Sequence, residues 1–265
     1  MSEPLYCAGI DVGSANAKCV IVEHDGAVAG FAIVPSGVGL VSAASQVLDD
    51  AVANAQISRT SIRSIFSTGY GREIVKEKTR SVTEITCHAR GALALFPATR
   101  LVIDIGGQDS KAIALDQNGT VSRFEMNDKC AAGTGRFLEV MARTLEVGLE
   151  KMGGVAMASH ETAEISSTCT VFAETEVVSL LAHGEKPASI VAGLCNAVAQ
   201  RVYGLAVRVG VAPEVTMTGG VSKNEAVVRA MRHMLGLDVN VPDEPLIVGA
   251  LGAALLALSD VCTKA

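Results

Sequence analysis

Two segments of the chain carry the same set of residues that could bind a phosphate group and a metal ion. Both have the pattern D-x-G-x-x-x-x-K, at residues 11–18 and 104–111. Each pattern follows an apolar run and leads into a β-rich run. Seven residues after each lysine comes a hairpin dipeptide, Asp25-Gly26 or Asn118-Gly119. Because all these landmarks recur at one offset, the chain is expected to consist of two related halves.

The chemistry that suits these segments is the binding of phosphate and magnesium. A turn after a buried strand exposes backbone N–H groups, and glycine lets phosphate oxygens approach them closely. Asp11 and Asp104 suit a hydrated magnesium ion, because this metal keeps several waters and takes few carboxylates. Lys18 would add positive charge near the phosphates, and Gln108 and Asp109 are candidates to orient an attacking water. The predicted catalytic residues are therefore Asp11, Asp104 and Gln108. The predicted phosphate contacts are Gly13, Ser14, Ala15, Asn16, Ala17, Lys18, Gly106, Gly107 and Gln108.

A single D-x-G turn is common without any ligand, and the alternative of two bare turns loses weight because both copies are in register. The Walker A pattern G-x-x-x-x-G-K-[ST] is absent from the sequence, so this is not a P-loop protein.

A third glycine turn, Gly219-Gly220, follows the apolar run 215–218 and precedes a predicted helix. By itself a Gly-Gly pair is a weak signal for a binding site, since it often marks only a turn. The order of the three turns resembles the phosphate-1, phosphate-2 and adenosine motifs of the superfamily of actin, sugar kinases and heat-shock chaperone ATPases. Residues 248–254 resemble the closely packed connecting helix of that superfamily. The resemblance implies ATP as the ligand, with Gly219 and Gly220 beside the adenosine.

Two cysteines lie in segments that could hold a metal cluster. Cys130 lies within 126–137 and Cys169 within 166–174, each just before a segment of helical periodicity. Both are expected at helix starts, where the helix dipole favours a thiolate. A cubane iron–sulfur cluster takes four thiolates, which a two-fold homodimer would supply. Two buried structural cysteines, favoured by composition alone, and a redox pair within one chain are the alternatives.

The other five cysteines give weaker signals. Cys7 and Cys19 fall in apolar strand runs and are expected in the core. The pair Cys87-His88 resembles a fragment of a metal site, but a packed helix is the favoured interpretation. Cys195 and Cys262 support no prediction.

Composition and charge narrow the class of protein. The 265 residues have 3% aromatics, no tryptophan and a net charge of −6. With no basic run, neither a nucleic acid nor a membrane surface is expected as a partner. The uncharged stretch 26–48 is broken by glycine and proline, and the first residues do not resemble a signal peptide. A cytoplasmic location with reduced thiols is therefore expected. Because the sequence contains no C-x-x-C pattern, neither a zinc ribbon nor a thioredoxin-like site is expected.

The periodicity predicts strands and helices in alternation, with a strand meander at the start of each half. Strands are expected within 5–34, 64–68, 101–123, 214–218 and 237–241, and helices at 37–56, 84–95, 131–146, 170–183, 187–209, 222–235 and the C-terminal segment. The predicted fold is α/β, with two duplicated actin/sugar-kinase-like lobes, mixed sheets and an interlobe nucleotide cleft. The first lobe is expected at 1–97, completed by a helix at 248–265, and the second, with Cys130 and Cys169, at 98–247.

Nearly the whole chain resembles the activator ATPases of 2-hydroxyacyl-CoA dehydratases, whose wider family includes ATPase subunits of benzoyl-CoA reductases. The motifs that carry this resemblance lie at 10–18, 67–72, 102–111, 126–137, 166–174 and 219–224. The segments around the two cysteines are long and specific, and they change the preferred interpretation of Cys130 and Cys169 to cluster ligands.

The resemblance implies a homodimer with one 4Fe–4S cluster, held by Cys130 and Cys169 of each subunit. It also implies one ATP and magnesium site per subunit, whose hydrolysis drives an electron onto a cluster-bearing partner enzyme. Ferredoxin or flavodoxin is the implied electron donor, and oxygen sensitivity is expected. Two departures from the family pattern are Ala15-Asn16-Ala17, where many relatives have Thr-Ala-Ser, and Phe66-Ser67, which replaces an apolar–Ala pair.

The leading hypothesis is therefore an ATP-driven electron-transfer activator. Its acceptor could be a 2-hydroxyacyl-CoA dehydratase, an aromatic-ring reductase of the benzoyl-CoA type, or another reductase with an unusual cluster. A small-molecule kinase of the same fold and a scaffold ATPase without redox function are the alternatives, but neither gives the cysteine segments a role.

Overall fold

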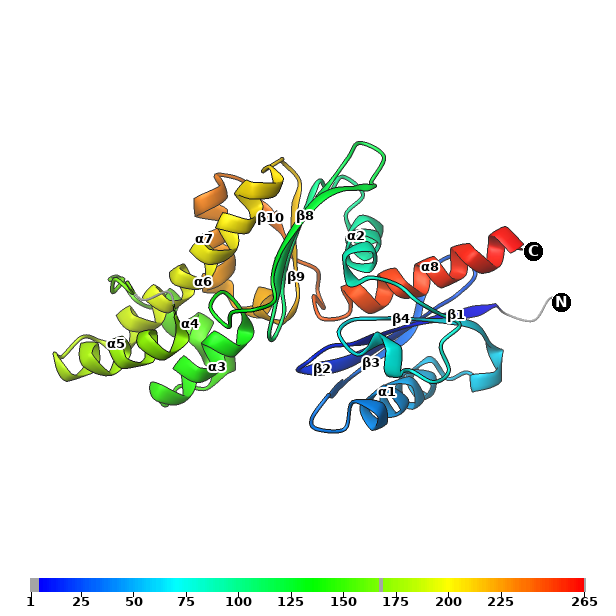
Figure 1. Cartoon of the computed structure of the whole chain (residues 1–265), viewed down its shortest axis with the longest axis horizontal. Coiled ribbons are helices and arrows are strands. Elements are labelled where there is room, and N and C mark those ends of the chain that lie inside the picture. Colours follow the sequence, from blue (N-terminus) through cyan, green and yellow to red (C-terminus); the bar gives the residue numbers. More distant parts are fainter. Residues whose placement is uncertain (1–4, 167–168, 265) are drawn as a thin grey trace. The chain divides into compact units, whose positions relative to one another are not determined.

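The computed structural model describes residues 5–166 and 169–264 and divides into two compact units. Unit 1 runs to Ala98 and also contains Asn118–Val121 and the segment from Leu246. Unit 2 comprises Thr99–Gln117 and Ser122–Pro245. Each unit contains one five-stranded sheet with parallel and antiparallel neighbours, so the predicted α/β class with mixed sheets is confirmed (Figure 1).

The sheet of unit 1 has the order β3-β2-β1-β4-β5. β1, β2 and β3 form the predicted antiparallel meander, and β4 and β5 continue in parallel from β1. The strands are β1 (Tyr6–Val12), β2 (Asn16–Val22), β3 (Val28–Pro35), β4 (Ile62–Thr68) and β5 (Arg80–Ser81). The helices are α1 (Leu40–Ala55), α2 (Glu84–Leu95) and α8 (Val248–Lys264), with short 3-10 turns η1 (Arg59–Ser61) and η2 (Arg72–Ile74).

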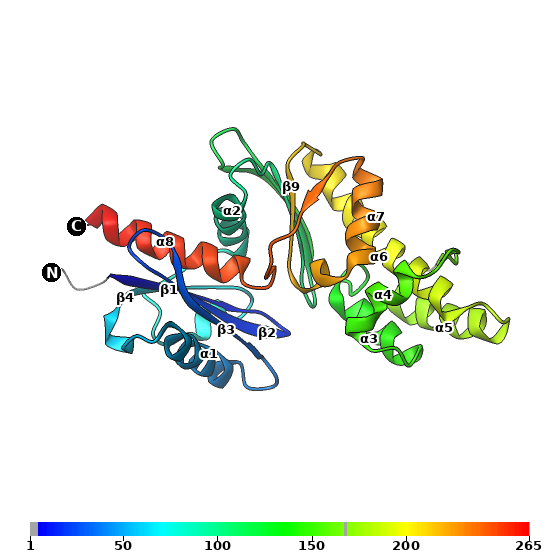
Figure 2. The ribbon, with the colours of Figure 1, turned by 180° about the vertical axis from the view of Figure 1, so that it is seen from behind.

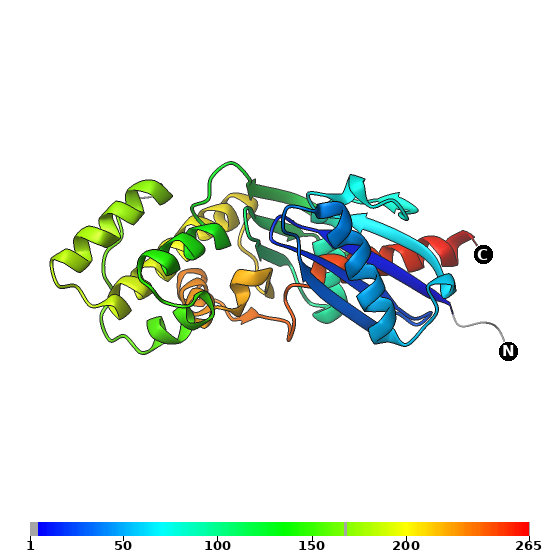
Figure 3. The same cartoon turned by 90° about the horizontal axis from the view of Figure 1, so that it is seen from below.

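Alternation along the strands sends side chains to two separate cores in unit 1. Ile10 of β1 and Ile21 of β2 lie in the cluster that includes α1. Cys7 and Val20 lie in the cluster that includes α8. Helix α1 therefore covers one face of the sheet, while α8 covers the other (Figures 1 and 3).

Small residues let α8 approach its neighbours at backbone distance. A methyl group on Gly252 of α8 would overlap the carbonyl oxygen of Cys87 in α2, and one on Gly9 of β1 would overlap the carbonyl oxygen of Ala250. This matches the close packing expected for residues 248–254.

The glycine at position 252 gives a prediction about stability. Gly252→Ala is expected to lower the free energy of unfolding by about 3 kcal/mol, because the added methyl group meets backbone that cannot rotate away. Gly154→Ala is the control, since that helical glycine has open space around it and is expected to gain about 0.5–1 kcal/mol. Thermal unfolding of both variants measures the difference, and an unchanged melting temperature for Gly252→Ala would contradict this packing.

The sheet of unit 2 has the order β10-β9-β6-β7-β8, with β6 antiparallel to β7 and parallel to β9. The strands are β6 (Leu101–Ile105), β7 (Ser110–Leu115), β8 (Val121–Asn127), β9 (Val215–Thr218) and β10 (Val239–Asn240). The α-helices are α3 (Gly135–Thr144), α4 (Met152–Met157), α5 (Thr170–Ala182), α6 (Pro187–Val209) and α7 (Glu225–Leu235), and η3 (Leu149–Lys151) and η4 (Gly220–Lys223) are 3-10 turns.

One core holds unit 2 together, and α6 runs through it beside α7 (Figure 2). Within the described residues α6 is long and apolar enough to cross a membrane, but 61% of its most apolar window is buried. Packing in the core therefore accounts for its apolar length.

The predicted helices at 84–95, 170–183 and 187–209 agree with the structure to within one residue. The helix predicted at 131–146 is shorter, because Gly133 has a φ of 83° and Thr134 is still extended at the N-cap. Cys130 therefore lies in a loop five residues before α3, and its predicted place at a helix start is wrong.

Candidate active site

The two D-x-G-x-x-x-x-K segments form the same turn in the two units. In each, the first aspartate and the lysine are direct cross-strand partners, Asp11 with Lys18 and Asp104 with Lys111. The glycine N–H closes each turn: Gly13 N donates to the Asn16 carbonyl at 3.1 Å, and Gly106 N to the Asp109 carbonyl at 2.9 Å. The repeat read from the sequence is thus a repeat of backbone geometry.

The lysine of each repeat pairs with its own aspartate. Lys18 Nζ lies 3.1 Å from Asp11 Oδ2, with both side chains mostly buried. Lys111 Nζ lies 3.2 Å from Asp104 Oδ2 and 2.8 Å from Asp109 Oδ2, and its side chain is only 1% exposed. Such a buried cation, flanked by two carboxylates, holds the second turn in one arrangement.

Asp104 has a further donor on its other oxygen. Thr218 Oγ1 donates to Asp104 Oδ1 at 2.9 Å, from the strand position directly beside it. A carboxylate oxygen has two lone pairs, so it can accept from a metal-bound water as well as from a neighbouring donor. The oxygen-only donor set therefore fits magnesium bound through water at this strand end.

A Thr-Gly pair after the neighbouring parallel strand is a second duplicated feature. Thr68 is paired with Asp11 across β4 and β1, just as Thr218 is paired with Asp104 across β9 and β6. The next residues, Gly69 and Gly219, have φ values of 86° and 84°, and a methyl group on either would press against the carboxylate of its unit. The sequence signal for this second repeat is the shared Thr-Gly dipeptide at 68–69 and 218–219.

The residues predicted to contact phosphate differ in their exposure to solvent. Gly13, Ser14 and Ala15 form the first turn, whereas Asn16, Ala17 and Lys18 belong to β2, and Ala17 is fully buried. In unit 2, Gly106 and Gly107 are partly exposed and Gln108 is exposed. Gly219 is buried beside the turn, and Gly220 is exposed.

The second turn is hydrogen-bonded to the start of α3. Gly135 N donates to the Gly106 carbonyl at 2.9 Å, and Arg136 N donates to the Gly107 carbonyl at 2.8 Å. A methyl group on Gly135 would lie 3.2 Å from Gly106 O and 3.5 Å from Val221, at the turn that follows β9. The beginning of α3 is therefore seated on both glycine turns of unit 2.

The loop with Cys130 connects β8 to this helix and is itself braced. Asn127 Nδ2 donates to the carbonyls of Cys130 at 2.8 Å and Ala132 at 2.9 Å. Thr134 Oγ1 donates to the Ala131 carbonyl at 2.6 Å. Cys130 is partly exposed.

Cys169 occupies the N-cap of α5, as predicted, and is exposed. Ser167 and Thr168 of its motif lie outside the described residues. Both cysteine segments border one cavity of about 710 Å³, through Ala132 and Gly133 on one side and Ser166 on the other. Thr144 Oγ1 at the end of α3 donates to Glu174 Oε1 of α5 at 3.2 Å. The two cysteine-bearing segments are thus neighbours within unit 2.

The remaining cysteines differ sharply in environment. Burial raises the pKa of Cys7 to about 11, of Cys195 to about 11 and of Cys87 to about 12, and it also raises that of Cys19. These four are protonated core residues, which confirms the prediction for Cys7 and Cys19. Cys262, on α8 of unit 1, is exposed. An accessible pair of thiols within one unit is therefore offered by Cys130 and Cys169, a donor set that fits half of a four-thiolate cluster.

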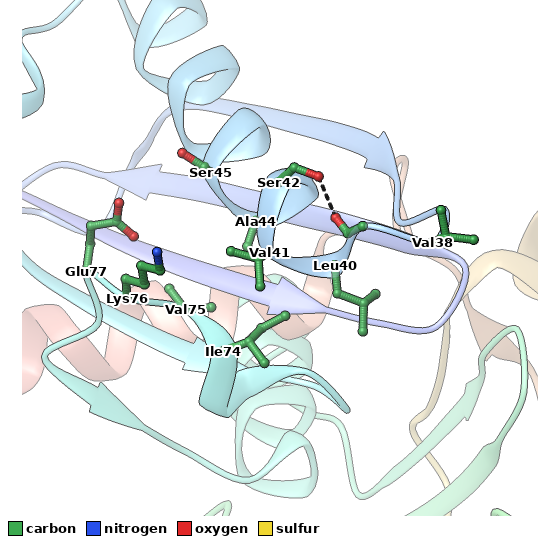
Figure 4. Close-up of a pocket in the computed structure, with 11 residues that line it drawn as sticks. Val38, Leu40, Val41, Ser42, Ala44, Ser45, Ile74, Val75, Lys76 and Glu77 are labelled. Carbon is green, nitrogen blue, oxygen red and sulfur yellow. Dashed lines mark hydrogen bonds between the residues drawn. The ribbon is translucent and has the colours of Figure 1, made fainter.

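A cavity of about 770 Å³ in unit 1 lies away from the predicted site residues. It opens between the first turn of α1 and the segment after η2, lined by Leu40, Val41, Ile74 and Val75 with Lys76 and Glu77 at its edge (Figure 4).

Two α/β units with duplicated D-x-G turns have the actin and sugar-kinase fold, as predicted. At 14% identity the ROK family glucokinase of Streptomyces griseus shares this fold, with a TM-score of 0.58 over 96% of this chain and 99% of that one. The chain belongs to the BadF/BadG/BcrA/BcrD ATPase family, whose model matches residues 8–257. This confirms the family resemblance read from the sequence.

Two relatives are much more similar. The activator of lactoyl-CoA dehydratase of Anaerotignum propionicum is 48% identical over 253 residues, which cover 96% of this chain and 97% of the relative. The solved structure of the activator of the 2-hydroxyisocaproyl-CoA dehydratase from Clostridium difficile contains ADPNP. It is 43% identical, with a TM-score of 0.94 over 98% of this chain and 97% of that one.

Proposed function

We propose that this ATPase is an activator that uses ATP to drive a low-potential electron onto a cluster-bearing 2-hydroxyacyl-CoA dehydratase. The observation that carries the proposal is that the start of α3 is hydrogen-bonded to the glycine turn at 106–107 in unit 2. The same unit presents two accessible cysteines, at the two ends of the segment between β8 and α5. The high similarity to two dehydratase activators supports the choice of acceptor.

The nucleotide site is assigned to the duplicated turns. Asp11 and Asp104 would hold magnesium through water, and the turn segments 13–18 and 106–108 would contact the phosphates, with the N–H groups of Gly13 and Gly106 closing these turns. Magnesium, when bound, neutralises phosphate charge and so makes the terminal phosphorus open to attack by water. Gln108, exposed beside the second turn, orients that water, and Gly219 and Gly220 lie beside the adenosine.

Coupling between nucleotide and cysteines follows from hydrogen bonds. The carbonyls of Gly106 and Gly107 accept the first N–H groups of α3, so a change in this turn moves the start of that helix. The braced Cys130 loop ends at the same point. ATP can shift the position of the Cys130 loop and the start of α3 only if the protein has two arrangements of this segment and ATP binds them with different affinity.

The cluster is assigned to Cys130 and Cys169 from each of two subunits, as one 4Fe–4S group on the two-fold axis of a homodimer. Directly after Cys169, helix α5 exposes large apolar side chains: Val171 and Phe172 are each 68% exposed and Val178 is 54% exposed. Apolar area of this kind beside a cluster ligand favours burial against a second copy. The cluster would serve as the electron carrier.

The electron donor and the cellular location are also part of the proposal. The family resemblance supports ferredoxin or flavodoxin as the electron donor, a cytoplasmic location and an oxygen-sensitive cluster. No nucleic acid and no membrane takes part.

Anaerobic purification with iron analysis tests the proposal. We expect a brown dimer with about four irons, whose ATPase activity increases the transfer of electrons to a dehydratase. A colourless, iron-free protein after anaerobic reconstitution would refute the electron-transfer role while leaving the ATPase intact.

A further inference from the structure

The second repeat holds a buried lysine between two carboxylates, and one of these carboxylates has no role in the proposed site. Lys111 has a side chain that is 1% exposed, and its Nζ lies 3.2 Å from Asp104 Oδ2 and 2.8 Å from Asp109 Oδ2. Asp104 is the proposed magnesium ligand, whereas Asp109 lies at the end of the turn with its side chain 28% exposed. The ammonium group therefore joins the magnesium carboxylate to the glycine turn.

Asp109 is fixed in the turn by its backbone and by both oxygens of its carboxylate. Its carbonyl accepts the Gly106 N–H at 2.9 Å, and its Oδ2 contacts Lys111. A methyl group on Gly106 would lie 2.6 Å from Asp109 Oδ1, so this oxygen lies directly against the glycine. A shift of the Asp109 carboxylate therefore either moves Gly106 or breaks one of these contacts.

The contacts continue from Gly106 to the loop with Cys130. The Gly106 carbonyl accepts the N–H of Gly135, the first residue of α3, at 2.9 Å. The preceding residue, Thr134, is buried and donates to the Ala131 carbonyl through its N–H at 3.1 Å and its hydroxyl at 2.6 Å. A continuous series of contacts within unit 2 therefore connects the proposed magnesium carboxylate with the residue that follows Cys130.

The first repeat has a different arrangement at the same positions. Asn16 stands at the position of the second carboxylate, so among the described residues Lys18 has Asp11 as its only carboxylate partner. The Gly13 carbonyl accepts from the hydroxyl of Ser36, just after β3, at 2.7 Å, whereas the matching carbonyl of unit 2 accepts a helix N–H. The second carboxylate thus occurs in the repeat whose turn bears the helix that follows the cysteine loop.

The shared lysine makes the turn of unit 2 sensitive to the charge at the end of β6. Ion pairs are strong in a buried environment, and a bound divalent cation is the largest local charge of a site. When a cation shares the charge of Asp104, Lys111 is attracted less to this carboxylate, and the balance of its two ion pairs moves toward Asp109. A change of charge at Asp104 therefore reaches the turn through the lysine.

We infer that Asp109 is a positioning residue, which through Lys111 ties the turn at 106–107, and with it the start of α3, to the occupancy of the nucleotide site. The inference rests on the proposed function and names the contact that carries its coupling. The alternatives are that Asp109 orients the attacking water or only stabilises the fold.

Asp109→Ala tests the inference, because it removes the contact with Lys111 but keeps the backbone carbonyl that closes the turn. The buried lysine retains Asp104 as a partner, so its charge is not left unpaired. Gln108→Ala is the matched control, since it removes the exposed side chain of the neighbouring residue in the same turn. Should Asp109→Ala fail to fold, Asp109→Asn, which removes the charge and keeps the volume, decides by the same comparison.

The measurement is backbone hydrogen exchange of the full chain, without ligand and with saturating magnesium and ADPNP, at segments 104–111 and 127–137. In the parent protein we expect the nucleotide to slow exchange at both segments by about fivefold or more. In Asp109→Ala the effect at 104–111 should persist, whereas the effect at 127–137 should fall below about twofold. Gln108→Ala should respond like the parent protein at 127–137.

Other outcomes overturn the inference in distinguishable ways. If Asp109→Ala responds like the parent protein at 127–137, Asp109 has no positioning role and the proposed coupling stands; a loss of hydrolysis in that variant would then assign it to the attacking water. If Gln108→Ala loses the response equally, the effect belongs to the turn as a whole and not to the ion pair.

The parent protein itself separates a failed inference from a failed function. An effect at 104–111 without one at 127–137 would refute the proposed coupling and the inference with it. No effect at 104–111 would show that the nucleotide site is wrongly assigned, which also overturns the inference. The electron-transfer role is tested separately by iron content.

Discussion

Asp104→Asn is expected to lower the rate of ATP hydrolysis by about 100-fold or more. The substitution removes a negative charge at the end of β6, where the proposed site needs it, and leaves side-chain volume almost unchanged. The fold should persist, because Lys111 keeps its partner Asp109 at 2.8 Å and the asparagine oxygen can still accept from Thr218. A destabilisation of about 1–3 kcal/mol remains, since a buried cation loses the charge of one neighbouring carboxylate.

Steady-state hydrolysis over a range of magnesium concentrations measures the effect, with circular dichroism to establish that the variant is folded. Asp116→Asn is the control: it removes the same charge from an exposed position in the β7–β8 hairpin and should change the rate by less than twofold. Hydrolysis by folded Asp104→Asn at the parent rate would place the nucleotide elsewhere.

The sequence predicted the elements of these turns but not their pairing. An aspartate and a lysine seven residues apart around a short turn become cross-strand partners, so the contact of Asp11 with Lys18 follows from the register of β1 and β2. The sequence interpretation instead assigned Lys18 to the phosphates. A ligand could recruit this lysine only by competing with the ion pair.

What could not be predicted depends on contacts between distant segments. His88 and Asp11 both border the same methyl-sized volume at Gly249 because α8, more than 150 residues later, packs on both α2 and β1. No local pattern in 84–95 predicts this neighbour of His88, because helical periodicity is the same for a histidine that only packs and for one with a function. The Thr-Gly pairs at 68–69 and 218–219 can be found in the sequence. Their equivalence, however, depends on strand pairing: β4 pairs in parallel with β1, and β9 pairs in parallel with β6.

The early start predicted for α3 shows a different limit. Helical periodicity continues back to residue 131, but Gly133 adopts positive φ over the stem of Arg201, where a methyl group would lie 2.6 Å from its Cγ. Tertiary packing thus starts the helix later than the periodicity predicts. The consequence is functional, because Cys130 is positioned by a braced loop and does not lie at the N-terminus of α3, where the helix dipole would favour its thiolate.

Cys169→Ser is expected to abolish iron binding, from about four irons per dimer to none, and electron transfer to the acceptor with it. Two of the four thiolates of the proposed cluster disappear at once, because each subunit contributes the same residue. ATP hydrolysis should stay within about threefold of the parent rate, since the turns at Asp11 and Asp104 are untouched. Iron analysis and visible absorption under anaerobic conditions, with hydrolysis assayed in parallel, measure both effects.

Cys262→Ser provides the matched control, because this cysteine is also exposed but lies on α8 in unit 1. It should keep the full iron content, whereas Cys130→Ser should lose it as Cys169→Ser does. The contrast separates a defined ligand set from iron picked up by any accessible thiol. If the serine variants at 130 and 169 keep four irons, or if all three variants lose iron equally, the cluster is not held by these cysteines. If iron is lost only in the variants at 130 and 169 and hydrolysis is retained, the two functions lie in separate segments. The duplicated turns then hydrolyse ATP, and the cysteine segments hold the electron carrier that this hydrolysis drives.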